Sequence, residues 1–311
     1  MGGLIAQRGW CPLALVRAMR PSQWTKNGVV LAAYFFARWD PSQQGNAAGW
    51  GALISALAAV AAFCAASSAV YLINDIHDRE ADRAHPQKRS RPLASGALAV
   101  APAVLAAAVL AAAGVAAGFA ITAGLGETIL AYLGLQALYT YGLRQVALVD
   151  AFIIAIGFVI RAVAGAVAID VRISPWLLLC AFLLALFLAL CKRRHEKVRS
   201  ESDETRTREA LDGYEARALD QAIAVVSAAT VVSYSLYTLS AETVTRFGTH
   251  CLGLTIPFVL FGILRYLDLV YRKGGGERPE RVLLTDRVLI VTILLYGLTA
   301  LTVFHLARGG V

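Results

Sequence analysis

Four polar side chains that could bind a metal ion stand close together after the second long apolar run. They are Asn74, Asp75, Asp78 and Asp82. We expect the preceding helix to continue through them, which places the three carboxylates within about an 80° arc. Carboxylates one turn apart at a helix C-terminus repel each other and oppose the helix dipole. A cation would offset this, and Mg²⁺ bridging to a substrate phosphate suits such oxygen ligands. The alternative is a solvated acidic turn paired with arginines.

A basic segment, residues 85–96, follows the aspartates directly. Cations beside a metal site could cover the charge that the metal leaves on a diphosphate. We assign phosphate contact to Lys88 and Arg91. For Arg89 we favour a membrane anchor on the cytoplasmic side.

The composition predicts the elements that position these residues. Hydrophobic residues make up 58% of the 311 and charged residues 16%, against roughly a quarter charged in soluble proteins. The apolar residues form runs of about the 20 residues that cross a bilayer. We predict an all-α, polytopic membrane protein with one domain, 1–311, and nine transmembrane helices. The predicted spans are 27–40, 51–73, 99–119, 121–141, 146–168, 174–191, 221–240, 250–271 and 285–306.

The charge distribution predicts the orientation. Of the 29 Lys and Arg residues, 23 fall in segments on the N-terminal side of the membrane and 4 on the other. The positive-inside rule therefore places the N-terminus in the cytoplasm and the C-terminus outside. The membrane is the inner, cytoplasmic one, and the long loops 74–98 and 192–220 face the cytoplasm. This placement also argues against reading the net charge of +8 as nucleic-acid binding.

Other residues that could act as nucleophiles or ligands lack a supporting pattern. The five cysteines form no CxxC pair, so we interpret them as small core residues. The five histidines are dispersed, and we assign none of them catalysis.

Polar residues at the start of the first span and within the fifth are further candidates. Gln23, Lys26 and Asn27 form a polar patch that we expect at the membrane surface. Asp150 and Arg161 are 11 residues apart on one helix, hence on one face and about 16 Å apart. An arginine inside a span is costly and usually faces the bundle interior. Arg161 could hold a lipid phosphate or a carboxylate such as Asp268, and a structural ion pair is at least as plausible.

The first motif, Asn-Asp-x-x-Asp-x-x-x-Asp followed by Lys-x-x-Arg-Pro, resembles the UbiA superfamily of intramembrane prenyltransferases. The resemblance covers nearly the whole chain. It implies a nine-helix bundle in which two loops, after helices 2 and 6, bind Mg²⁺ and a diphosphate. It also implies that Tyr139, Arg144 and Asp150 are candidate substrate-binding residues.

The second loop departs from the usual acidic pattern of that superfamily. Its candidate binding residues are Lys192, Arg193, Glu196, Asp212, Tyr214 and Asp220. The basic residues could equally be anchors that end the sixth span. Asp212 and Asp220 could complete a second metal contact or pair with arginines of the loop.

The resemblance extends to members with such a basic loop, and it implies two anionic substrates. The donor is then phosphoribosyl diphosphate and the acceptor a polyprenyl (decaprenyl) phosphate, for a cell-wall arabinan precursor. The alternative is transfer of a prenyl group to an aromatic acceptor. A transporter or Mg²⁺ channel is a third reading, disfavoured by the few intramembrane charges. Assembly into a homo-oligomer is left open.

Overall fold

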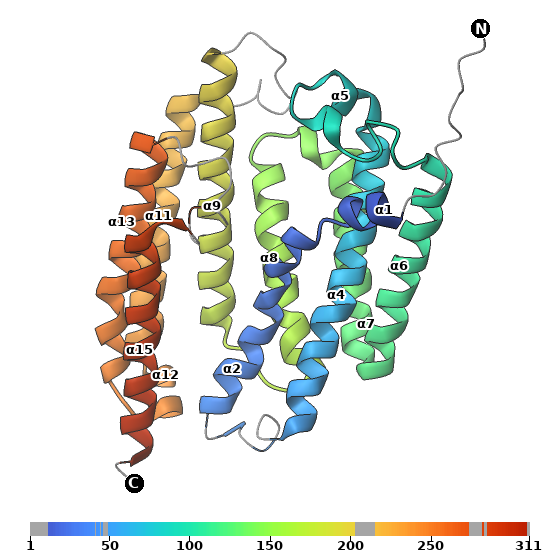
Figure 1. The fold of residues 1–311 in the computed structure, drawn as a ribbon. Helices are drawn as coiled ribbons and strands as arrows, with labels where there is room; N and C mark the ends of the chain where they lie inside the picture. Colours follow the sequence, from blue (N-terminus) through green and yellow to red (C-terminus); the bar gives the residue numbers. More distant parts are fainter. Residues whose placement is uncertain are drawn as a thin grey trace, which may run out of the picture. The chain divides into compact units, whose positions relative to one another are not determined.

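The structure is a computed structural model that describes residues 12–40, 42–43, 45, 49–202, 215–273, 282 and 285–309. Its regular elements in these ranges are all helices (Figure 1). Seven of the helices are long and apolar enough to cross a membrane. The predicted all-α, multi-pass class is therefore confirmed. The two remaining predicted spans fall on α7 and on the helical stretch of η1 and α2, which lie outside that set of seven.

The chain divides into two compact units that alternate along the sequence. Unit 1 is built from 1–35, 46–141 and 160–171, and unit 2 from 36–45, 142–159 and 172–311. The chain passes from one unit to the other inside two helices. They are α2 (Leu31–Trp39) and α8 (Val149–Ala168).

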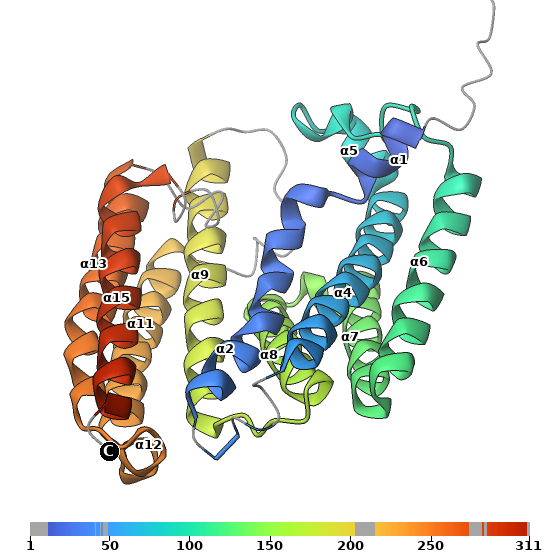
Figure 2. The same ribbon diagram turned by 60° about the horizontal axis from the view of Figure 1, so that its bottom comes forward.

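Unit 1 is organised around the long helix α4, which packs against α6 and α7 (Figure 2). The contact is close because small residues face each other. A Cβ added to Gly114 of α6 would lie 3.0 Å from the carbonyl oxygen of Ala62 on α4. Small residues let membrane helices approach in this way. Its other elements are α1 (Pro12–Ala18), η1 (Pro21–Val30), α4 (Trp50–His77), α5 (Arg79–Ala84), η2 (Lys88–Ser90), α6 (Val100–Ile121) and α7 (Ala123–Tyr141).

The first predicted span begins as a 3₁₀ helix, η1, and becomes an α-helix only at Leu31. The last residue of η1, Val30, lies against the second half of α8. A Cβ on Gly165 would come within 1.9 Å of the carbonyl oxygen of Val30. Only a residue without a side chain permits this approach of two backbones, and it fixes η1 against α8 inside unit 1.

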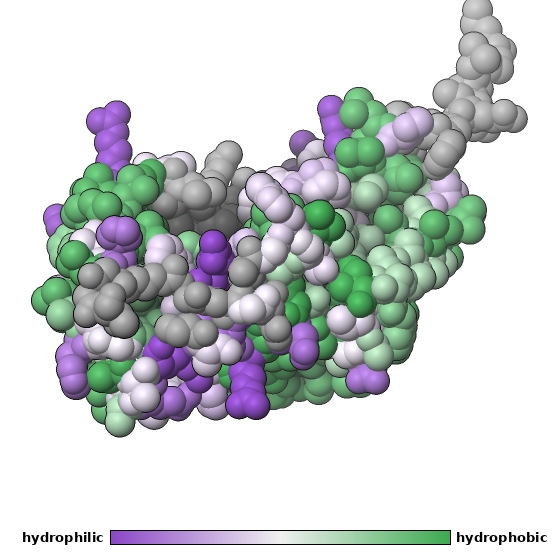
Figure 3. Space-filling view, turned by 90° about the horizontal axis from the view of Figure 1, so that it is seen from below, coloured by the Kyte–Doolittle hydropathy of each residue, from purple (hydrophilic) through white to green (hydrophobic). Residues whose placement is uncertain are grey.

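Unit 2 has its core between α9, α11 and α13. Phe187, Leu190, Leu219 and Tyr266 are at most 2% exposed there. The outer faces carry large exposed apolar side chains, as a surface in contact with lipid requires. Figure 3, which views the molecule from one end, shows hydrophilic residues among the hydrophobic ones there. Its elements besides the first half of α8 are η3 (Leu143–Gln145), α9 (Pro175–Ser202), α11 (Ala216–Leu239), α12 (Ala241–Phe247), η4 (Cys251–Thr255), α13 (Ile256–Lys273) and α15 (Arg287–Gly309).

Candidate active site

The acidic motif lies at a break between two helices. α4 ends at His77 and α5 begins at Arg79, while Asp78 between them has φ −85° and ψ 2°. The expectation of one continuous helix is therefore wrong. Three aspartates close together favour such a break, because negative charge is unfavourable at a helix C-terminus. The break changes the direction of the chain between the first and third aspartates.

Two of the aspartates nevertheless converge. Asp75 and Asp82 are 2% and 3% exposed. The Nη1 atom of Arg91 lies 2.6 Å from Asp82 Oδ2 and 3.3 Å from Asp75 Oδ1. Arg20 forms a second ion pair with Asp75. Burying two carboxylates is costly unless cations accompany them, and here two arginines do.

Arg20 is the residue at this cluster that the sequence reasoning missed. Its backbone is left-handed, with φ 54° and ψ 63°, a sparsely populated conformation for a residue with a side chain. Its guanidinium also lies over the ring of Tyr71, 5.0 Å from the centroid. The available signal was an arginine directly before Pro21 at the head of the first span.

The other predicted residues of this motif lie close to Asp75 and Asp82 in the sequence. Asn74 is held by Thr140 of α7, whose hydroxyl donates to its side-chain oxygen at 2.6 Å. Lys88 lies half-buried in η2, three residues before Arg91, and Arg89 is exposed. Arg91, which directly follows η2, thus joins Asp75 of α4 to Asp82 of α5. Asn74 precedes Asp75 on α4, and Asp78 occupies the break between α4 and α5.

The residues fit a magnesium ion by donor type, since all three aspartates offer hard oxygen ligands. Among the described residues, no group of three acidic, His or Cys side chains is arranged as a complete ligand set. The two carboxylates that meet at one nitrogen of Arg91 mark a point where positive charge is favoured. A metal there would take its remaining ligands from water and substrate phosphate, as Mg²⁺ commonly does.

A second polar group of unit 1 lies deeper in the helices. Arg161 is 6% exposed, and its Nε donates to Asn27 at 2.8 Å. Its Nη2 donates to the hydroxyl of Tyr132 at 2.9 Å, and the guanidinium lies over that ring. Asn27 also donates to Ser67 and is 1% exposed, so its expected position in a surface patch is wrong. Its amide is instead needed to meet buried polar groups.

Unit 2 contains a buried ionic group at the start of α8 and the C-terminal part of α9. Asp150 and Arg193, 0% and 2% exposed, form an ion pair. Arg193 also bonds Glu196, and Lys192 Nζ lies 4.0 Å from the same carboxylate. The structure therefore brings Asp150 of α8 to three candidate residues, Lys192, Arg193 and Glu196, that the sequence predicted together in the second loop. Asp150 and Arg161, although both on α8, belong to different groups. Asp268, the suggested partner of Arg161, pairs with Arg265 and Arg272.

Asp220 pairs with Arg194 and accepts a hydrogen bond from Tyr271 at 2.8 Å. This arginine pairing is one of the two roles expected for Asp220, and the metal contact stays a prediction. Asp212 and Tyr214 lie outside the described residues. The remaining candidates are half-buried on helical elements: Gln23 and Lys26 on η1, Tyr139 on α7 and Arg144 on η3.

Comparison with known proteins identifies the family. Residues 29–202, more than half of the chain, match the model of the UbiA prenyltransferase family. The chain belongs to this family. The match covers both the acidic motif of unit 1 and the Asp150–Arg193 pair of unit 2.

Two curated relatives that are similar in sequence to this UbiA chain carry the same name. A decaprenyl-phosphate phosphoribosyltransferase of Mycolicibacterium smegmatis is 37% identical, over 90% of this chain and 89% of its own length. The decaprenyl-phosphate phosphoribosyltransferase of Corynebacterium glutamicum is 35% identical, over 90% of this chain and 83% of its own length. Among solved structures, a UbiA homolog from Archaeoglobus fulgidus, bound to DMAPP and Mg²⁺, superposes with a TM-score of 0.69. It is 18% identical and covers 94% of this chain and 99% of its own, which establishes the likeness of fold.

Proposed function

We propose that this protein transfers the 5-phosphoribosyl group of phosphoribosyl diphosphate to a polyprenyl phosphate such as decaprenyl phosphate. The products are diphosphate and polyprenylphosphoryl-5-phosphoribose. The second of these would be a precursor for cell-wall arabinan. The observation that carries the proposal is the identity of 37% and 35%, over nine-tenths of the chain, to two relatives named for this reaction. A second acidic motif would suit an enzyme whose only anionic substrate is one diphosphate. This chain instead has Lys192, Arg193 and Arg194 at that position, which supports two anionic substrates.

We further propose that the reaction takes place at the cytoplasmic face of the inner membrane. The chain would cross that membrane nine times, with its N-terminus in the cytoplasm and its C-terminus outside. Support comes from the distribution of Lys and Arg, because cytoplasmic loops carry an excess of both. The polyprenyl tail then stays in the hydrocarbon layer while the water-soluble donor arrives from the cytoplasm.

Residues of the acidic motif bind the donor. Asp75, Asp78 and Asp82 would hold Mg²⁺, which supplies neutralising charge to the diphosphate as it leaves. Arg91 and Lys88 bind diphosphate oxygens that the metal does not cover. Arg91 moves from the two carboxylates to the phosphate as the donor arrives, so the same guanidinium serves both states.

The reaction needs no general base. The bond between ribose C1 and the diphosphate oxygen breaks, and its electron pair leaves with the diphosphate. Positive charge grows at C1, where nearby carboxylates stabilise it. An oxygen of the acceptor phosphate, already ionised near neutral pH, forms the new bond from the opposite face and inverts C1. The absence of an assigned His or Cys nucleophile agrees with this route.

The acceptor phosphate requires separate cations. Lys192 and Arg193 are proposed to bind it, with Asp150 and Glu196 holding Arg193 in place through the ion pairs described above. Arg161 and Asn27 are proposed as polar contacts of the lipid substrate within the helices.

A two-substrate assay tests the function. Membranes containing the protein are incubated with labelled phosphoribosyl diphosphate plus decaprenyl phosphate, or with a prenyl diphosphate plus 4-hydroxybenzoate, each with and without Mg²⁺. We expect a labelled lipid only from the first pair and only with the metal. Product from the second pair alone would replace the proposal by aromatic prenyl transfer.

A further inference from the structure

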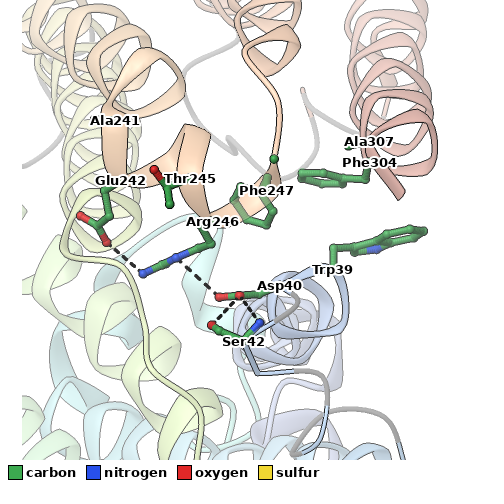
Figure 4. Close-up of a pocket in the computed structure, with 11 residues that line it drawn as sticks. Trp39, Asp40, Ser42, Ala241, Glu242, Thr245, Arg246, Phe247, Phe304 and Ala307 are labelled. Atoms are coloured by element: carbon green, nitrogen blue, oxygen red, sulfur yellow. Dashed lines mark hydrogen bonds and ion pairs between the residues drawn. The ribbon is translucent and has the colours of Figure 1, made fainter. Parts of the chain in front are cut away.

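A pocket of about 770 Å³ lies in unit 2, beside the end of α2, the short helix α12 and the end of α15 (Figure 4). The proposed reaction makes no use of it. α11 separates it from the basic residues of the second loop. Asp220, which pairs with Arg194 of that loop, lies near the first turn of α11, whereas α12 of the pocket follows the last turn of α11. At 1.5 Å per residue this is roughly 30 Å along the helix, about the thickness of the hydrocarbon layer. The pocket therefore lies at the opposite membrane interface.

One side of the pocket is a row of charged groups. Arg246 Nη2 donates to Glu242 at 2.9 Å, and its Nε lies 3.5 Å from Asp40 Oδ2. Asp40 is 2% exposed and is fixed by Ser42 and Gln43, which both donate to it. Arg246 and Glu242 remain accessible, with 23% and 52% of their side chains exposed. The row thus offers a held cation and an accessible carboxylate side by side.

The other side of the pocket is aromatic. Trp39 stacks on Phe304 with ring centroids 5.8 Å apart, and Phe247 contacts Phe304 at 4.9 Å. Figure 4 shows Trp39 and Phe304 on the side away from Glu242, with Phe247 between Phe304 and Arg246. A tryptophan at the end of an apolar helix is typical of the lipid headgroup region.

Charge decides which lipid fits. Asp40 balances Arg246, so Glu242 leaves the row with one net negative charge among its three members. An anionic headgroup would meet that carboxylate, whereas a zwitterionic one places its ammonium on Glu242 and its phosphate on Arg246. We propose that this pocket binds a phospholipid with an ammonium headgroup, such as phosphatidylethanolamine, with the glycerol and first methylenes against the aromatic side.

The experiment is a lipid competition on the intact purified protein. The protein is exchanged into equal amounts of phosphatidylethanolamine and phosphatidylglycerol, and the retained lipids are identified by native mass spectrometry. We expect wild type to retain phosphatidylethanolamine several-fold over phosphatidylglycerol. Glu242→Gln should abolish the preference and Glu242→Arg should reverse it. Glu215→Gln makes the same chemical change on an exposed residue just before α11 and should leave the preference unchanged.

The Glu242 variants leave Arg246 and Asp40 themselves unchanged, so they test lipid binding apart from the structural link between α12 and the end of α2. Ala307→Trp places a bulky side chain in the pocket lining and leaves the three charged residues in place. It should lower phosphatidylethanolamine retention if the Glu242 variants fail to fold. No lipid preference in wild type, or one that Glu242→Arg and Ala307→Trp both leave intact, would overturn the proposal.

Discussion

At the scale of single residues, the site consists of carboxylates whose charge is met by arginines. Asp75 illustrates the arrangement, since both Arg20 and Arg91 contact the same Oδ1 atom. A buried carboxylate with two cations is stable as it stands, yet a guanidinium can move to a phosphate when one arrives. The arginines thus hold the site together before the substrates bind.

Replacing Asp75 by Asn should remove activity and leave the fold intact. We expect a loss of about 100-fold or more, because the charge that stabilises the reacting centre is lost in a buried site. The same result is expected for Asp78→Asn. Product formation by purified protein at controlled Mg²⁺, together with a melting curve, measures both properties. Glu80→Gln, an exposed residue on α5, is the matched control. Near-wild-type turnover in either aspartate variant would remove these residues from the site.

The ion pair between Asp150 and Arg193 gives a prediction in which stability and activity separate. Arg193→Met alone should destabilise the protein by about 3–5 kcal/mol, because a buried charge is left without its partner. The double variant Asp150→Leu with Arg193→Met should recover most of that stability, since an apolar pair often replaces a buried ion pair. Activity should stay lost in both. If the double variant were active, the pair would have only a structural role.

At the scale of helices, close packing of small residues fixes the elements that carry the site. Val30 and Gly165 show this most directly, because the carbonyl of one occupies the space that a side chain on the other would need. η1 carries Arg20 just before its start and Asn27 within it, so the position of this contact sets where both side chains lie.

Gly165→Ala should therefore destabilise unit 1 and lower activity. The added Cβ at 1.9 Å from Val30 O forces the backbones apart, at a cost of about 1–3 kcal/mol for overpacking. Gly134→Ala on α7 is the control, since its Cβ would meet nothing within 4 Å. That change should be neutral or stabilising, by up to about 1 kcal/mol. Thermal unfolding in detergent compares the two, and equal melting temperatures would contradict the packing argument.

The sequence predicted the helices well and their interruptions poorly. Long apolar runs identify spans without further information, and each predicted span overlaps helical residues. The break at Asp78 was missed because helical periodicity assumes that the helix continues. Arg20 was missed because its position before Pro21 does not reveal that it contacts Asp75, 55 residues further along the chain. The pairing of Asp150 with Arg193 likewise depends on how α8 and α9 pack, which no spacing within one helix reveals.

At the scale of the whole molecule, the charge asymmetry predicts which loops face each side. Cys251 is exposed in η4, whereas Cys191 is buried. A membrane-impermeant maleimide should therefore label Cys251 in right-side-out vesicles, and Cys251→Ala should lose that label. A cysteine introduced as Ser90→Cys, at an exposed position of the first loop, should react only after permeabilisation. The reverse pattern would overturn the proposed orientation.

The alternation of the two units along the sequence has a consequence for the order of synthesis. Residues 160–171 belong to unit 1 but follow a stretch, 142–159, that belongs to unit 2. The ribosome must therefore have delivered the whole of α8 before Val30 can meet Gly165 and Asn27 can meet Arg161. The earlier helices of unit 1 are therefore inserted in the bilayer but incompletely packed until about half of the chain has been translated. A gene split within α8 would leave neither fragment with a complete unit.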